Sequence, residues 1–129
     1  MDHDHFVQQV QHRARLASNG EAIAAIRSTL ETLAERLAGG ETEDLAAQLP
    51  QEIGYYLRSS DEKWDGERFD VAEFFRRVSE RERAGLPDAV FHARAVMSVL
   101  DEAVSPGEME DVRDQLPDDY SLLFEKVTS

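Results

Sequence analysis

The chain contains one segment twice, and this internal repeat constrains its fold more than any other sequence feature. When the chain is compared with itself at an offset of 67 residues, 11 of the 38 positions from Gly20 to Leu57 are identical. Ordinary composition would give roughly two or three identities by chance. Two copies of one supersecondary unit can each cover the apolar face that the other leaves exposed. The identical residues of the first copy are Ala22, Arg27, Leu33, Glu35, Gly40, Glu41, Glu43, Asp44, Gln48, Leu49 and Pro50.

Apolar residues recur at helical spacing in both copies. Ser18 and Glu21 have the spacing of a capping box, and the apolar stripe that follows them ends at Gly39-Gly40. No apolar run alternates with the period of two that strands require. The pattern predicts an all-α, compact helical bundle made of two homologous multi-helix repeats related by a pseudo-twofold axis. The stripe residues are Ile23, Ile26, Leu30, Leu33 and Leu37 in the first copy and Val90, Ala93, Met97, Leu100 and Val104 in the second.

The repeat also sets the domain organisation. We expect one domain over residues 1–129, with repeat one at 4–57, a linker at 58–69 and repeat two at 70–127. The linker is polar and has no clear period, but it contains Trp64 and Phe69. Because large aromatic side chains are rarely left in solvent, the linker should pack across the surface of the bundle.

The charge of the chain limits its partners and its environment. Asp and Glu number 27 against 14 Lys and Arg, for a net charge of -13, and the only lysines are Lys63 and Lys126. Repulsion makes nucleic acid and anionic membranes poor partners. An acidic chain almost without lysine is typical of proteins that work in molar salt, so we expect a halophilic, archaeal origin. The absence of cysteine excludes disulfides and thiolate sites.

The N-terminal segment gives no sign of targeting. It is charged and is followed by no apolar stretch of signal-peptide length, so a cytoplasmic location is expected. Met1-Asp2-His3 could hold copper or nickel through the free amine and the imidazole, which makes His3 and His5 weak metal-ligand candidates. A solvated, histidine-containing terminus is the simpler interpretation.

A repeated Gly-Glu-x-Glu-Asp motif places three carboxylates within one turn of each copy. Such clusters could bind calcium or magnesium, which prefer oxygen ligands. Adjacent helical residues point to different faces, however, and acids at a helix N-terminus are stabilising on their own. The favoured interpretation is therefore that these acids stabilise the helix N-terminus rather than bind a metal. The weak metal candidates are Glu41, Glu43, Asp44, Glu108, Glu110 and Asp111.

Two arginines, Arg27 and Arg94, occupy equivalent places in the two long helical segments. Each could bind an anionic ligand, or could form a forked ion pair with an acid of its own copy such as Asp44 or Asp111. The ion pair is favoured because the cation and the acid recur together.

Aromatic residues gather near the ends of both copies. If exposed, they would be anchors for a protein partner. If buried, they would close the core where the copies meet, which is the favoured interpretation. The candidates for a partner surface are Tyr55, Tyr56, Trp64 and Tyr120.

Two segments carry a family resemblance: Leu33-Ala34-Glu35-Arg36-Leu37, and Gly40 to Pro50 with its counterpart Gly107 to Pro117. On these residues the chain resembles, over nearly its whole length, the uncharacterised prokaryotic family known as domain of unknown function 2267. The resemblance implies an all-helical domain without an established function and without catalytic residues to transfer. The second copy departs from the pattern by a proline at Ser105-Pro106-Gly107.

None of the common catalytic or phosphate-binding motifs occurs in the sequence. We therefore expect a non-enzymatic protein-interaction or regulatory module of a halophilic cytoplasm, without a cofactor, whose partner is another protein or a second copy of the chain. The alternative is a small metal-dependent hydrolase or divalent-metal-binding protein that uses the repeated Glu and Asp clusters.

Overall fold

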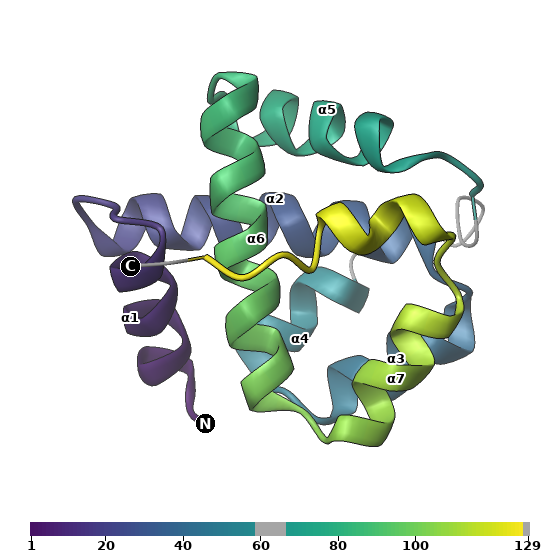
Figure 1. Cartoon of the computed structure of the whole chain (residues 1–129). Coiled ribbons are helices and arrows are strands. Elements are labelled where there is room, and N and C mark those ends of the chain that lie inside the picture. The colour runs from purple at the N-terminus through teal and green to yellow at the C-terminus, as the bar shows by residue number, and fades with distance from the viewer. Residues whose placement is uncertain (59–66, 128–129) are drawn as a thin grey trace.

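Every regular element in residues 1–58 and 67–127, the parts of the chain that the computed structural model describes, is a helix (Figure 1). The helices pack into one compact unit with a single core, which confirms the predicted all-helical fold. The elements are α1 (His3–Arg13), α2 (Asn19–Arg36), α3 (Gly39–Ala47), α4 (Gln51–Arg58), α5 (Val71–Glu82), α6 (Leu86–Ala103), α7 (Pro106–Asp114) and the 3-10 helix η2 (Asp118–Leu122).

The helix bounds follow the internal repeat. Helices α2 and α6 each contain 18 residues, and α3 and α7 each contain nine. The first and last residues of each pair are separated by the same 67 positions as the repeated sequence. The copies differ where they end, because α4 is an α-helix of eight residues whereas its counterpart η2 is a five-residue 3-10 helix.

Side-chain caps start several helices, including the one that the sequence predicts at Ser18. The Ser18 hydroxyl accepts a hydrogen bond from the Glu21 amide at 3.1 Å, and the Glu21 carboxylate accepts one from the Ala17 amide at 2.9 Å. Asp70 caps α5 by accepting from the Glu73 amide at 2.9 Å. These bonds satisfy amide groups that have no partner within the helix.

Helices α2 and α6 cross near the centre of the molecule (Figure 1) and contact each other there. Helix α2 also packs against α1, α4 and α5, and α6 packs against α1 and α5. The predicted stripes form the core at this crossing, although their first residues, Ile23 and Val90, are only half-buried. The buried stripe residues are Ile26, Leu30, Leu33, Leu37, Ala93, Met97, Leu100 and Val104.

The described part of the predicted linker packs on α2. The Glu67 amide donates to the Glu35 carbonyl at 3.0 Å, and the Phe69 carbonyl accepts from Arg36 Nε at 3.0 Å. Trp64 lies outside the described residues. Arg58 belongs to α4 rather than to the linker.

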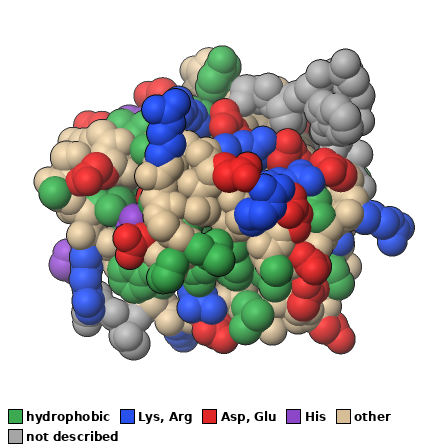
Figure 2. Space-filling view, turned by 90° about the horizontal axis from the view of Figure 1, so that it is seen from above, with side chains coloured by type: hydrophobic (Ala, Val, Ile, Leu, Met, Phe, Trp, Pro, Cys, Tyr) green, Lys and Arg blue, Asp and Glu red, His purple; other side chains and the backbone are tan. Residues whose placement is uncertain are grey.

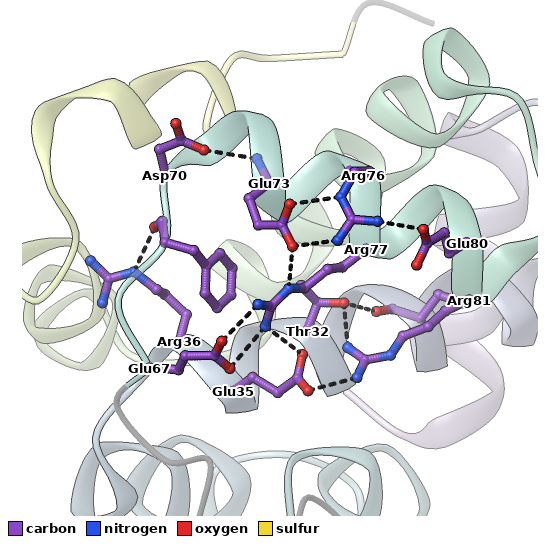
Figure 3. Close-up of polar contacts among 12 residues, drawn as sticks. Thr32, Glu35, Arg36, Glu67, Asp70, Glu73, Arg76, Arg77, Glu80 and Arg81 are labelled. Carbon is purple, nitrogen blue, oxygen red and sulfur yellow. Dashed lines mark hydrogen bonds and ion pairs between the residues drawn. The ribbon is translucent and has the colours of Figure 1, made fainter.

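A half-buried arginine, Arg77, links this segment to α2 and α5 (Figure 3). It donates to Glu67 at 2.8 Å and 3.0 Å and to Glu73 at 2.8 Å, and it forms an ion pair with Glu35 at 3.3 Å. Its guanidinium carbon lies 4.0 Å from the centroid of the Phe69 ring. Arg77 therefore ties three acids and an aromatic ring together at one point.

Neighbouring arginines complete this network. Arg81 pairs with Glu35 at 2.8 Å and donates to the Thr32 hydroxyl at 2.7 Å. Hydrogen bonds from Arg76 and then from Arg77 lower the pKa of Glu73 to about 2. Figure 2, a view over α5, shows acidic and basic side chains interspersed on this face rather than a uniformly acidic coat.

None of the helices in the described ranges is long and apolar enough to span a bilayer.

Candidate functional site

The N-terminal turns of α3 and α7 bring equivalent carboxylates together. The two helices contact each other and lie side by side at the lower right of Figure 1. Glu41 and Glu108 are each the third residue of their helix, and Asp111 follows Glu108 by one turn. One carboxylate oxygen from each of these three residues lies within 4.8 Å of the other two. We refer to Glu41, Glu108 and Asp111 as the carboxylate cluster.

Burial makes Glu108 the unusual member of the carboxylate cluster. Its relative exposure is 8%, whereas Glu41 is half-buried and Asp111 is exposed. Among the described residues, Oε1 of Glu108 and Oε1 of Glu41 are shielded from solvent and have no hydrogen-bond partner. Burial, then a hydrogen bond with the Glu41 carboxyl group and its negative charge, and then the charges of Asp44 and Asp111 raise the pKa of Glu108 to about 7.

Two equivalent glutamines form hydrogen bonds between the copies, at the N-termini of the helices that carry the cluster. The Ala38 amide donates to Gln115 Oε1 at 3.0 Å, and the Ser105 amide donates to Gln48 Oε1 at 2.7 Å. Ala38 and Ser105 are equivalent at the offset of 67, and so are Gln48 and Gln115. The two bonds are thus reciprocal, as in a two-fold symmetric interface.

Neither glutamine stands out in the sequence as part of a site. Gln48 and Gln115 are among the repeated identities, so their recurrence was a usable signal. Their role depends on contacts between copies, which the residues near them in the chain do not reveal.

The sequence prediction for the acidic motifs therefore needs refinement. Glu108 and Asp111, one turn apart in the second motif, converge with Glu41 of the first motif, whereas Glu43, Asp44 and Glu110 do not join them. Glu43 turns away to α4, where Arg58 binds it at 2.9 Å and, through a hydrogen bond, lowers its pKa. Glu110 is exposed and lies outside the carboxylate cluster, while exposed Asp44 contributes negative charge to it.

The equivalent arginines have different surroundings. Arg94 Nε donates to the Leu122 carbonyl at 2.7 Å, and its NH2 group pairs with Glu125 at 3.1 Å. Arg27 is exposed and forms no ion pair with a described residue. Neither arginine pairs with Asp44 or Asp111 among the described residues. For Arg94, the end of η2 and the C-terminal segment after it, which crosses α6 (Figure 1), supply the Leu122 carbonyl and the Glu125 carboxylate instead.

The aromatic candidates for a partner surface differ in burial. Tyr55 is 64% exposed, and Tyr56 is half-buried and contacts the Tyr55 ring edge-on. Tyr120 is 1% exposed, and its hydroxyl donates to the Phe69 carbonyl at 2.8 Å. Burial raises the pKa of Tyr120 to about 12. Tyr120 is therefore a core residue and not part of a partner surface, and Trp64 lies outside the described residues.

The histidines near the N-terminus do not form a metal site with the carboxylate cluster. His3 pairs with Asp4 at 3.2 Å, and His5 is exposed. Within the described ranges, the carboxylate cluster is the group of potential metal ligands that the structure brings together.

A hollow of about 410 Å³ lies beside α6 and the C-terminal segment, and it includes four cations in its lining. Its arginines are paired with acids that also line it: Arg13 with Glu102 at 2.5 Å, Arg94 with Glu125 at 3.1 Å, and Arg113 with Asp101 at 3.5 Å. An anionic ligand would have to displace these acids, so the hollow is a weaker candidate than the carboxylate cluster.

A buried His–Glu pair outside the cluster leads to a pH prediction. His92 forms an ion pair with Glu82, and their side chains are 12% and 7% exposed. The hydrogen bond with Glu82 raises the pKa of His92. Because the folded-state pKa is higher than that of the unfolded chain, the pair stabilises fully below about pH 6.5, and its contribution is lost as pH rises through the folded-state pKa.

His92→Gln should therefore lower the free energy of unfolding by about 1–2 kcal/mol at pH 6 and by less at pH 9. Urea unfolding of both proteins from pH 5 to 9 measures this difference. A difference that stays constant with pH would contradict the prediction.

Comparison with known proteins gives one match. The model of a protein family described as "Uncharacterized conserved protein (DUF2267)" matches residues 3–123, a range that includes the first copy, most of the second, the carboxylate cluster and the two glutamines. A search of curated proteins found no match. Because the match spans nearly the whole chain, this protein belongs to the DUF2267 family of uncharacterised conserved proteins.

Proposed function

We propose that this protein is a divalent-cation-binding module that holds one cation in the carboxylate cluster between its two copies. The observation that carries the proposal is Glu108, a carboxylate with 8% exposure whose Oε1 has no hydrogen-bond partner among the described residues. A buried charge without a partner costs several kcal/mol. A cation between Glu41, Glu108 and Asp111 would remove this cost.

The donor atoms favour calcium. All three side chains offer carboxylate oxygens, which suit calcium, magnesium and manganese. The three oxygens lie within 4.8 Å of one another, so one ion can reach all of them. Calcium accepts flexible, irregular sets of oxygen ligands, whereas magnesium demands near-octahedral geometry, so calcium is the expected ion. Asp111 is exposed, so water can complete the coordination.

Calorimetric titration of chelator-treated protein with calcium chloride at pH 7.5 tests the proposal. We expect one calcium ion per chain, tighter binding of calcium than of magnesium, and a higher melting temperature with calcium present. Glu110→Gln is the matched control, because Glu110 belongs to the same motif but lies outside the cluster. Glu108→Gln should abolish binding. A wild-type protein that takes up no calcium, magnesium or manganese at millimolar concentration would refute the proposal.

The arrangement of the copies is part of the same proposal. We infer that the copies are related by a pseudo-twofold axis that passes between Glu41 and Glu108. The matching helix lengths and the two reciprocal glutamine bonds support this relation. Of the described candidates for a partner surface, Tyr55 is the exposed one. The protein-interaction role stays a prediction.

We also propose that the protein works in a halophilic cytoplasm, because it has 27 acidic residues and two lysines. Concentrated salt screens repulsion between exposed carboxylates. The melting temperature should therefore rise from low salt to molar potassium chloride, measured in chelator so that calcium does not contribute. A melting temperature that does not rise would contradict salt adaptation.

A further inference from the structure

We infer that Gln48 and Gln115 are positioning residues of the cation site. Each accepts the N-cap amide of the opposite copy, and so leaves the glutamate at the third helical position free to face the cation. This inference rests on the cation binding proposed above. It adds an explanation of how the glutamate oxygens are kept free to bind the cation.

The glutamates would otherwise have a competing hydrogen bond to make. In a capping box, the residue at the third helical position accepts from the backbone amide of the N-cap residue. Ser105 and Glu108 have this spacing, and the Glu108 amide donates to the Ser105 hydroxyl at 3.2 Å. The reciprocal half of the box is missing, because the Ser105 amide donates to Gln48 instead, at 2.7 Å.

Helix α2 provides an internal comparison. Ser18 and Glu21 have the same spacing, and the Glu21 carboxylate turns back to the backbone, where it accepts from the Ala17 amide, one residue before the cap, at 2.9 Å. At the start of α7 the amide in that position, Val104, donates to the Leu100 carbonyl at 3.2 Å. The Ser105 amide is then the backbone partner left for Glu108, and Gln48 occupies it.

The second glutamine acts on the other side of the cluster. Gln115 Oε1 accepts from the Ala38 amide at 3.0 Å, and its Nε2 donates to Glu41 Oε2 at 3.3 Å. Its amide group thus occupies one oxygen of Glu41 and leaves Oε1 without a partner among the described residues. Both glutamines therefore keep one glutamate oxygen available between the copies.

Substitution of Gln48 tests the inference through calcium affinity. Gln48→Met keeps the length of the side chain but removes the acceptor, so Glu108 should turn back to the Ser105 amide. We expect calcium affinity to fall at least tenfold, whereas Gln48→Glu, which keeps an acceptor oxygen, should retain it. Gln8→Met, an exposed glutamine on α1, is the control and should change nothing. A Gln48→Met protein that binds calcium within twofold of wild type would overturn the inference and leave the proposed function intact.

A second measurement does not depend on calcium. Hydrogen exchange of the Ser105 amide, followed by NMR in chelator, should stay slow in wild type and in Gln48→Met, where Glu108 replaces the glutamine. It should become fast in the double variant Gln48→Met/Glu108→Ala. If the Ser105 amide already exchanges fast in Gln48→Met, Glu108 does not compete for it and the inference fails. If wild type binds no cation, the proposed function fails, while this exchange experiment still decides whether Gln48 controls Glu108.

Discussion

Glu108→Gln should raise the free energy of unfolding of the calcium-free protein by about 2 kcal/mol at pH 8. The pKa of Glu108 is raised to about 7 in the folded state, so the folded protein binds more protons than the unfolded chain between about pH 4.5 and 7. Stability therefore falls as pH rises through this window. Glutamine has a similar shape and carries no charge, so it avoids the loss.

Urea unfolding in chelator at pH 8 and at pH 5 measures this effect. The advantage of Glu108→Gln should shrink at pH 5, where the wild-type carboxyl group is protonated in the folded state. Glu110→Gln, the exposed control, should change the unfolding free energy by less than about 0.5 kcal/mol. If Glu108→Gln is less stable than wild type at pH 8, the charge of the buried Glu108 carboxylate does not destabilise the folded protein.

Saturating calcium should reverse the order of the two proteins. Wild type gains about 2.7 kcal/mol when the calcium concentration is about 100 times the dissociation constant, whereas Glu108→Gln has lost a ligand and gains little. If Glu108→Gln stabilises the calcium-free protein and also removes the stabilisation by calcium, Glu108 serves to bind the ion. A residue needed only for the fold would destabilise the calcium-free protein when substituted.

Arg77→Met should lower the free energy of unfolding by about 3 kcal/mol. The Arg77 side chain is 20% exposed and contacts Glu35, Glu67 and Glu73 as well as the Phe69 ring. Methionine keeps much of the apolar contact but leaves three acids with fewer partners, and Glu35 is 17% exposed. The loss of a charge that neutralises half-buried carboxylates is the main cost.

The adjacent Arg76 gives a matched control. It lies on the same helix and pairs with Glu73 and Glu80, but its side chain is 54% exposed. Arg76→Met should cost less than about 1 kcal/mol, and added salt should reduce that cost further. Urea unfolding at 0.1 M and 1 M salt compares the two variants. Equal losses for Arg76→Met and Arg77→Met would mean that burial does not determine the strength of these contacts.

The sequence predicts well those features that depend on nearby residues. The caps at Ser18 and Asp70 involve residues three positions apart, so the local sequence determines them. The apolar stripes likewise predict which faces of α2 and α6 are buried, because helical periodicity fixes the direction of each side chain.

The carboxylate cluster could not be predicted in the same way. It depends on contact between helices 67 residues apart in the chain, which brings Glu41 of the first motif to Glu108 and Asp111 of the second. Repetition alone did not distinguish Glu41, which joins the cluster, from Glu43, which pairs with Arg58. Nor did it predict that Arg94 would meet Glu125, because the residue at the equivalent position of the first copy is Arg58, which has the opposite charge.

The covalent connection between the copies lets the two sides of the cluster change separately. In a symmetric homodimer, each substitution near the two-fold axis occurs twice, so both ligands change at once. Here the equivalent N-cap residues are Ala38 and Ser105, and the equivalent glutamates differ in burial. Substitutions can therefore alter the proposed cation site one ligand at a time, which is not possible in a symmetric homodimer.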